Sequence, residues 1–282
     1  MITKQLQTVA FQGERGAFSE IAAEKFFNKK ILTIPFYSFD EVFSEVRKGN
    51  VDYGIIPIEN TLHGSVFENY DLLLNYSLPI TGEINLQIHH YLMASKKYII
   101  SELKKIYSHP QAIGQCSAFL KNLKNVEIVP SYDTAGSVII SKENKEEPTA
   151  AIASIRASEI YGMKILKKQI QNNKENYTRF LIISKKKNSG IISNPKTSIC
   201  FDLKSIPGAL HKALGVFASR GINLVKIESR PIPHKPFQYT FYIDLIGNLN
   251  DKKIKSTLKD LSEIALSIKK FGSYLIGKIY SS

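Results

Sequence analysis

Three clusters of polar residues, each directly after an apolar stretch, are suited to bind a small anion and to move a proton. They are Glu59-Asn60-Thr61, Ser108-His109-Pro110-Gln111 and Asp133-Thr134-Ala135. In open α/β sheets, ligands gather outside the carboxyl ends of the strands, where helix N-termini offer free N–H groups. We therefore expect the three clusters to face one cleft.

Each cluster also has a purely structural interpretation. Thr61, Ser108 and Thr134 could be helix caps, because serine and threonine commonly cap the helices that they precede. Glu59 fits this interpretation less well, since a carboxylate is rarely buried unless it is paired or takes part in chemistry. The pattern alone leaves both interpretations open.

Alternating strands and helices position these clusters. The apolar runs predict, in order, strand 6–11, helix 17–28, strand 31–36, a helix within 38–49, strand 52–58 and helix 64–75. Ser38 and Glu41 have the spacing of a capping box, and Gly49 is a helix stop signal.

A long extended segment over residues 78–94 leads to a second series of elements. This series comprises strand 105–107, helix 110–123, strand 126–129, helix 134–141, strand 150–153 and helix 154–161, and a strand over 176–184 then returns. Such alternation is typical of α/β doubly wound sheets with helices on both faces. We expect two lobes, about 1–80 plus 170–184 and about 85–168, joined by two hinge strands around a cleft.

A different pattern follows the charged segment 185–196, which we interpret as a linker. Strand 197–203, helix 208–220, strands 223–229 and 238–246, helix 251–264 and strand 267–271 give the order βαββαβ. At about 80 residues, this order predicts a ferredoxin-like domain over 197–275.

The composition is that of an ordinary globular protein. Of 282 residues, 43% are hydrophobic and 22% are charged, and the net charge is +13 with 32 Lys against 6 Arg. A lysine-dominated excess spread along the chain is a weak sign of nucleic-acid binding, since such sites favour arginine. We expect no nucleic-acid partner and no membrane association, and the absence of an apolar leader or span suggests a cytoplasmic protein.

Cofactor and metal signatures are missing from the sequence. The glycines of GERGAFSE lack the spacing of dinucleotide and phosphate loops, the six histidines show no ligand spacing, and Cys116 and Cys200 are far apart. His89 and His90 alternate faces on an extended segment, which argues against a shared metal ion. We expect neither a cofactor nor a metal.

Seven motif blocks in order resemble the prephenate dehydratase family of the monofunctional bacterial type with a C-terminal ACT regulatory domain. They are F-Q-G-x-x-G-A-F-S-E from Phe11, P-I-E-N-T-x-x-G-S-V from Pro57, S-H-P-Q-A from Ser108, D-T-A from Asp133, A-A-I-A-S from Ala150, N-x-T-R-F from Asn176 and I-E-S-R-P from Ile227. The resemblance covers nearly the whole chain and implies a two-lobed, periplasmic-binding-protein-like catalytic region over 1–184 and an ACT domain over 197–275. Thr61 stands where the family usually has serine.

The resemblance implies a lyase that removes carbon dioxide and water from prephenate to give phenylpyruvate, without a cofactor. It makes Thr178 the residue essential to dehydration, with Glu59 or a water that it holds supplying the proton. The further residues assigned to catalysis or substrate binding are Asn60, Thr61, Ser108, Gln111, Thr134, Arg179 and Phe180. For Arg179, pairing with a substrate carboxylate and bracing of the hinge are equally open.

The resemblance also implies feedback inhibition by phenylalanine bound between ACT domains of neighbouring subunits, and hence a homodimer or homotetramer. The residues implied for the effector are Gly208, Ala209, Leu210, Asn223, Glu228, Ser229 and Arg230. His211 stands where the family more often has an aliphatic residue. The alternatives that we weigh are an arogenate dehydratase, whose motifs are nearly the same, and a two-lobed amino-acid sensor without chemistry.

Overall fold

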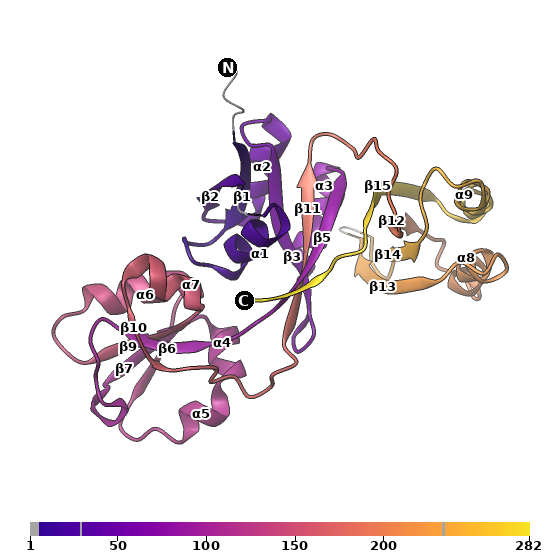
Figure 1. Ribbon diagram of the computed structural model, residues 1–282. Helices are drawn as coiled ribbons and strands as arrows, with labels where there is room; N and C mark the ends of the chain where they lie inside the picture. Colours follow the sequence, from indigo (N-terminus) through magenta and orange to yellow (C-terminus); the bar gives the residue numbers. More distant parts are fainter. Residues whose placement is uncertain (1–5, 29, 233–234) are drawn as a thin grey trace, which may run out of the picture. The chain divides into compact units, whose positions relative to one another are not determined.

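The computed structural model of the chain describes residues 6–28, 30–232 and 235–282 (Figure 1). Contacts divide the chain into two compact units. The first contains Met1–Leu72, Ile84–Phe180 and Lys278–Ser282, and the second contains Leu73–Glu83 and Leu181–Gly277. The boundary crosses two strands, β5 (Ile80–Gln87) and β11 (Tyr177–Ser184), and the helix α3 (Phe67–Tyr76), so each of these elements contributes to both units.

The first lobe is built on a sheet with the order β16-β5-β11-β3-β1-β2. Its remaining strands are β1 (Gln7–Gln12), β2 (Ile31–Phe36), β3 (Tyr53–Asn60), the short β4 (Gly64–Ser65), which pairs with β3, and β16 (Ile279–Ser281). β1 runs parallel to both β2 and β3. The helices of this lobe are α1 (Phe18–Phe26), α2 (Phe39–Lys48) and α3 (Phe67–Tyr76).

Local sequence signals explain why α2 begins and ends where it does. The Ser38 side chain accepts a hydrogen bond from the Glu41 N–H, and the Glu41 carboxylate accepts one from the Ser38 N–H, which completes the predicted capping box. Gly49 ends the helix in the left-handed conformation, with φ of 86°. The apolar face of α2, with Val42, Phe43 and Val46, is fully buried.

The second lobe contains a five-stranded sheet with the order β10-β6-β9-β7-β8. Its elements are β6 (Tyr91–Ala94), the 3-10 turn Ile100–Glu102, β7 (Lys105–Ser108), α4 (Pro110–Gln115), α5 (Ser117–Lys121), β8 (Glu127–Pro130), α6 (Thr134–Glu143), β9 (Thr149–Ala153), α7 (Ile155–Tyr161) and β10 (Lys164–Lys167). The predicted continuous helix over 110–123 is wrong, because Cys116, with φ of −109° and ψ of 13°, separates α4 from α5. β10 pairs with β6 and was not predicted.

Two hinge segments connect the lobes, as the sequence predicts. Residues 88–90 lead from β5 to β6, and residues 168–176 return from β10 to β11, with the Ile88 N–H donating to the Asn176 carbonyl at 2.7 Å. On the opposite side of the lobes, the Ser154 hydroxyl donates to the Gly16 carbonyl at 2.6 Å, and the Glu14 N–H donates to Asp133 at 3.1 Å. The lobes therefore contact each other beyond the hinge.

The second unit contains the predicted βαββαβ domain. Its elements are β12 (Pro195–Asp202), α8 (Ala209–Ala218), β13 (Leu224–Pro231), β14 (Tyr239–Ile246), α9 (Lys252–Ile264) and β15 (Ser267–Leu275). The strands form an antiparallel sheet with the order β13-β14-β12-β15. Its core buries one face of both helices, with Phe217 from α8 and Leu258 and Leu261 from α9.

The C-terminal strand β16 has no counterpart among the predicted elements. It runs parallel to β5 in the first unit, with Ile279 opposite Asn85 and Ser281 opposite Gln87. Three residues are too few to show a strand period, and therefore only the pairing reveals this strand. No helix within the described parts of the chain is both long and apolar enough to cross a membrane.

Candidate active site

A cavity of about 340 Å³ lies in the first unit, at the ends of strands from both lobes. The first turns of α1, α4 and α6 surround it, together with the end of β3 and the start of β11. Its lining comprises Gln12, Ala17, Phe18, Ser19, Phe39, Pro57, Asn60, Val66, Ile88, His90, His109, Gln111, Ala112, Gln115, Tyr132, Asp133, Thr134, Thr178 and Phe180.

The lining combines aromatic rings with neutral hydrogen-bond donors. Phe18, Phe39 and Phe180 provide apolar surface, whereas amides and hydroxyls supply most of the polar groups. No lysine or arginine is among the lining residues of the described chain. An anion in this cavity would therefore be held by neutral donors.

Asn60 and Thr178 form the best-defined polar pair of the cavity. The Asn60 Oδ1 accepts hydrogen bonds from the backbone N–H groups of Leu62 and His63, at 2.9 and 3.1 Å. This leaves the Nδ2 to donate to Thr178 Oγ1 at 2.9 Å. Since Thr178 finds no acceptor for its own proton among the described residues, its hydroxyl is a donor available to a ligand.

A chain of buried side chains extends from this pair to the hinge. Asn60 Nδ2 also donates to Asn176 Oδ1 at 2.8 Å, and Asn176 Nδ2 donates to Gln115 Oε1 at 2.9 Å. The same Gln115 oxygen lies 2.6 Å from His90 Nε2. All four side chains belong to residues that are at least 93% buried, so every amide in the chain has a defined orientation.

The amide nitrogen of Gln115 is open to the cavity. Its oxygen accepts two hydrogen bonds, whereas its Nε2 has no partner among the described residues and is not enclosed by protein. Gln115 lines the cavity beside Gln111, one helical turn earlier in α4. Both side-chain amides can therefore donate to a bound anion.

His109 and Asp133 cap the two helices at the cavity. His109 Nδ1 accepts from the Gln111 N–H at 3.2 Å, and Asp133 Oδ1 accepts from the Gly136 N–H at 2.7 Å. Burial lowers the pKa of His109, and the nearby Asp133 carboxylate partly opposes this decrease. Burial also raises the pKa of Asp133. Both residues orient the helix ends that face the ligand.

Four residues expected at the site do not line the cavity. Glu59 Oε2 lies 3.8 Å from Arg179 Nη1. Thr178 and Phe180 of β11 line the cavity, and since successive residues of a strand point to opposite faces, Arg179 between them points to the face of the sheet away from the cavity. With its side chain 38% exposed on that face, Glu59 is not brought to Thr178, and the expected proton relay through Glu59 has no support in this geometry.

Thr61 and Ser108 have structural contacts instead. Thr61 Oγ1 accepts from the Tyr177 N–H at 3.0 Å and so joins the end of β3 to the start of β11. Ser108 is fully buried, and its hydroxyl donates to the Ile152 carbonyl at 2.7 Å. Ser108 does not act as the helix cap that the sequence also allowed, since His109 takes that place for α4, and Asp133 in place of Thr134 caps α6.

The cavity thus brings together Asn60, Gln111, Thr134, Thr178 and Phe180 from the expected set. Sequence reasoning missed His90, Gln115 and Asn176 as members of one network. A spacing of four residues from Gln111 was the only signal for Gln115, since i and i+4 share a helix face. His90 had no comparable signal, because its partner is 25 residues away in the chain.

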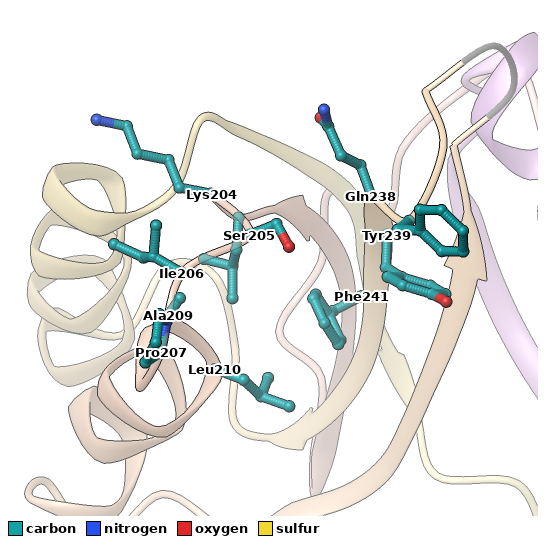
Figure 2. A pocket seen from close by; sticks show the side chains of 11 residues that line it. Lys204, Ser205, Ile206, Pro207, Ala209, Leu210, Gln238, Tyr239 and Phe241 are labelled. Carbon is teal, nitrogen blue, oxygen red and sulfur yellow. The ribbon is translucent and has the colours of Figure 1, made fainter.

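A second cavity, of about 330 Å³, lies in the second unit beside the loop that leads into α8 (Figure 2). Ala209 and Leu210 of the expected effector residues line it, together with Tyr239 and Phe241 of β14. Gly208 stands at the N-terminus of α8 in the left-handed conformation, with φ of 79°. The other expected residues, Asn223, Glu228, Ser229 and Arg230, lie on or just before β13 and do not line this cavity.

Comparison with known proteins places this fold among the lyases that carry a C-terminal ACT domain. Residues 9–188 match the family Prephenate dehydratase, and residues 197–263 match the ACT domain. The chain belongs to the prephenate dehydratase family. The arogenate dehydratase/prephenate dehydratase 2, chloroplastic, of Arabidopsis thaliana is 42% identical over 280 residues, which cover 94% of this chain and 72% of that protein.

Two solved structures resemble the chain over nearly its whole length. A prephenate dehydratase from Arthrobacter aurescens in complex with L-Phe has a TM-score of 0.86 at 30% identity and covers 95% of this chain and 90% of its own. GqqA, described as a novel type of quorum quenching acylase, has a TM-score of 0.86 at 28% identity, and the match covers 95% of this chain and 97% of GqqA. Because one fold can host several chemistries, the residues of the site have to support the function.

Proposed function

We propose that the chain converts prephenate to phenylpyruvate by decarboxylating dehydration, with phenylalanine as the feedback effector of its ACT domain. The observation that carries this proposal is the Thr178 hydroxyl, which accepts from Asn60 and faces the cavity as a donor. A donor held in this way suits the departure of a hydroxyl group from a bound ring.

The reaction needs little chemistry from the protein. When the ring carboxylate leaves as carbon dioxide, its bonding electron pair enters the cyclohexadiene ring, and the C4–O bond breaks as the ring becomes aromatic. The departing hydroxide, hydrogen-bonded to Thr178, takes up one proton that the solvent supplies in the overall reaction, and leaves as water. Because the ring itself accepts the electron pair, orientation, a hydrogen bond to the leaving oxygen and exclusion of water are the remaining tasks.

The lining residues can divide these tasks. Thr178 donates to the leaving hydroxyl oxygen, and the hydrogen bond that it accepts from Asn60 polarises its O–H bond. The two carboxylates accept hydrogen bonds from Gln111 in the first turn of α4, from Gln115 at the end of α4 and from Thr134 in the first turn of α6. The phenylalanine rings of the lining cover the cyclohexadiene and keep water out.

Thr178→Val tests this proposal, because valine keeps the shape of threonine and lacks the hydroxyl. We expect kcat for prephenate to fall by about 10²- to 10⁴-fold in Thr178→Val, with Thr178→Ser retaining most of the rate. Phenylpyruvate formation is followed by its ultraviolet absorbance in alkali, and circular dichroism checks the fold. A folded Thr178→Val enzyme with the wild-type rate would remove Thr178 from this role.

We infer that the cavity favours prephenate over arogenate. Arogenate carries an ammonium group in place of the side-chain keto oxygen, and would need acceptors where the cavity presents the amide donors of Gln111 and Gln115. Among the described residues of the lining, Asp133 is the only carboxylate, and both of its oxygens already accept backbone N–H groups, from Gly136 and Glu14. We expect a higher kcat/KM for prephenate when the two substrates are compared in one assay.

For regulation, we propose that phenylalanine binds at the loop before α8 and at β13 of a second copy, so that the active form is a cytoplasmic homodimer or homotetramer. The shared effector site would unite Gly208–Leu210 of one ACT domain with Asn223 and Glu228–Arg230 of its neighbour, two groups that one chain does not bring into one cavity. Sedimentation with and without phenylalanine tests the shared site, and a protein that is inhibited by phenylalanine while it sediments as a monomer would contradict it.

We also propose that the catalytic region covers residues 1–184 and the ACT domain residues 197–275.

A further inference from the structure

His90 is a buried imidazole at the edge of the cavity, in the hinge segment between β5 and β6. Its backbone is held on both sides, since its N–H donates to Gln171 Oε1 at 3.0 Å and its carbonyl accepts from the Ile170 N–H at 2.9 Å. The ring packs edge to face with Phe18, with a centroid distance of 5.4 Å. The position of the ring is therefore well determined.

The proton of this imidazole can be assigned from the network around it. The backbone N–H groups of Leu62 and His63 fix the Asn60 amide, Asn60 fixes Asn176, and Asn176 in turn requires an oxygen from Gln115. The atom that lies 2.6 Å from His90 Nε2 is thus an acceptor, and Nε2 must carry a proton.

The other ring nitrogen agrees with this assignment. His90 Nδ1 is buried and has no partner among the described residues. A proton on Nδ1 would be a buried donor without an acceptor, which is less tolerated than an acceptor without a donor. The neutral Nε2–H tautomer therefore fits the network, whereas the Nδ1–H tautomer would leave a buried N–H without an acceptor and would set the Nε2 lone pair against the oxygen of Gln115.

We propose that His90 is a positioning residue for the dehydratase: its Nε2–H holds the oxygen of Gln115, so that the Gln115 NH₂ faces the cavity as a donor to an acceptor oxygen of the substrate. The inference rests on the proposed function for the identity of the ligand, an anion with carboxylate and keto oxygens. A reversed Gln115 amide would set its NH₂ against two donors, Asn176 Nδ2 and His90 Nε2, and would present an oxygen to the anion.

Removal of the His90 donor should weaken substrate binding more than turnover. We expect His90→Leu to raise the KM for prephenate by about 10- to 100-fold, the range for one hydrogen bond to a charged group, with kcat within about threefold of wild type. His90→Gln should restore the KM to within about threefold, since the Gln side chain can place an N–H near the position of Nε2.

His89→Leu is the matched control. His89 is the adjacent histidine, is also buried, and contacts the amide of Gln171 through Nδ1 at 2.9 Å, yet it does not line the cavity. A KM that rises equally in His89→Leu and His90→Leu, without recovery in His90→Gln, would mean that His90 only supports packing, and would overturn the proposal.

Nitrogen NMR of the free enzyme tests the tautomer without any activity. In ¹⁵N-histidine-labelled wild-type protein, the resonances missing from His90→Gln are those of His90, and we expect them to show Nε2–H and a bare Nδ1. An Nδ1–H tautomer would overturn the proposal even if His90→Leu did not fold. If the NMR result holds but no prephenate is consumed by wild type, the proposed function fails and the orientation of Gln115 stands.

Discussion

At the residue scale, the direction of each hydrogen bond decides what the cavity can do. A threonine hydroxyl has one proton to donate and two lone pairs that can accept, and because the Asn60 amide is the donor of their shared hydrogen bond, the proton of Thr178 stays available to a ligand. Gln115 follows the same logic through His90 and Asn176. Backbone N–H groups at the end of β3 are the origin of both orientations.

The burial that keeps His90 neutral makes stability depend on pH. Burial lowers the pKa of His90 from the ordinary 6.5 to about 4. As the pH falls, His90 therefore takes up a proton in the unfolded chain before it does so in the folded protein. The contribution of neutral His90 to the free energy of unfolding is complete above about pH 6.5 and is lost as the pH falls toward 4. We expect the free energy of unfolding to drop by about 2 kcal/mol from this residue between pH 7 and pH 5.

Urea unfolding of wild type and His90→Gln at pH 7 and pH 5 measures this contribution. Other titrating groups are common to both proteins, so the difference between them isolates His90. The loss of stability on acidification should be smaller in His90→Gln by about 2 kcal/mol. An equal loss in the two proteins would show that His90 is not held neutral by burial.

At the scale of elements, the close approach of α1 and α7 brings the lobes together. Gly16, just before α1, has a φ of 91°, and a Cβ at this position would lie 2.7 Å from the Cα of Ala157 in α7. Its carbonyl accepts from the hydroxyl of Ser154, the N-cap of α7. A side chain is thus excluded both by the conformation and by the neighbouring helix.

Gly16→Ala should separate these two elements. We expect a loss of about 1–3 kcal/mol in the free energy of unfolding, from the left-handed conformation and the contact with α7, and a higher KM as the lobes move apart. Gly114→Ala is the control, since this glycine lies within α4 and nothing is within 4 Å of its Cβ. That change should be neutral or stabilise by about 0.4–1 kcal/mol. Equal effects of the two substitutions on urea unfolding would contradict the argument.

At the scale of the whole molecule, β5 and β11 each belong to two compact units. Thr178 and Phe180 of β11 line the cavity, and the strand continues from Leu181 into the unit that contains the ACT domain. Within this second unit, Glu83 of β5 pairs with Lys196 of β12 through both carboxylate oxygens, at 2.8 and 2.9 Å. Both side chains are buried, with 1% and 10% exposed.

Lys196→Met should destabilise the second unit, because it removes the ammonium group that pairs with both oxygens of the buried Glu83 carboxylate. Breaking a buried pair in this way costs about 3–5 kcal/mol, which the urea transition followed by circular dichroism would show. The double substitution Glu83→Gln and Lys196→Met should recover most of the loss. In contrast, Lys48→Met, which removes an exposed pair with Glu45, should leave the transition where it is. A Lys196→Met protein as stable as wild type would show that the pair contributes little.

The sequence by itself determined the order and type of most elements and the family of the chain. Runs of apolar residues, the capping signals at Ser38 and Gly49 and the polar clusters after β3, β7 and β8 are local features, and local features are readable from neighbouring residues. These clusters placed Asn60, Gln111 and Thr134 at one cleft, and the family resemblance added Thr178.

Only the tertiary structure decided which side chains enter the cavity and how they face. Glu59 and Asn60 are adjacent in the sequence, yet Asn60 contacts Thr178 and Glu59 pairs with Arg179, because successive residues of a strand point to opposite faces. The partners of His90, Gln115 and Asn176 come from segments 25 to 116 residues apart. An amide has no preferred direction until both of its neighbours are in place, and only folding supplies them.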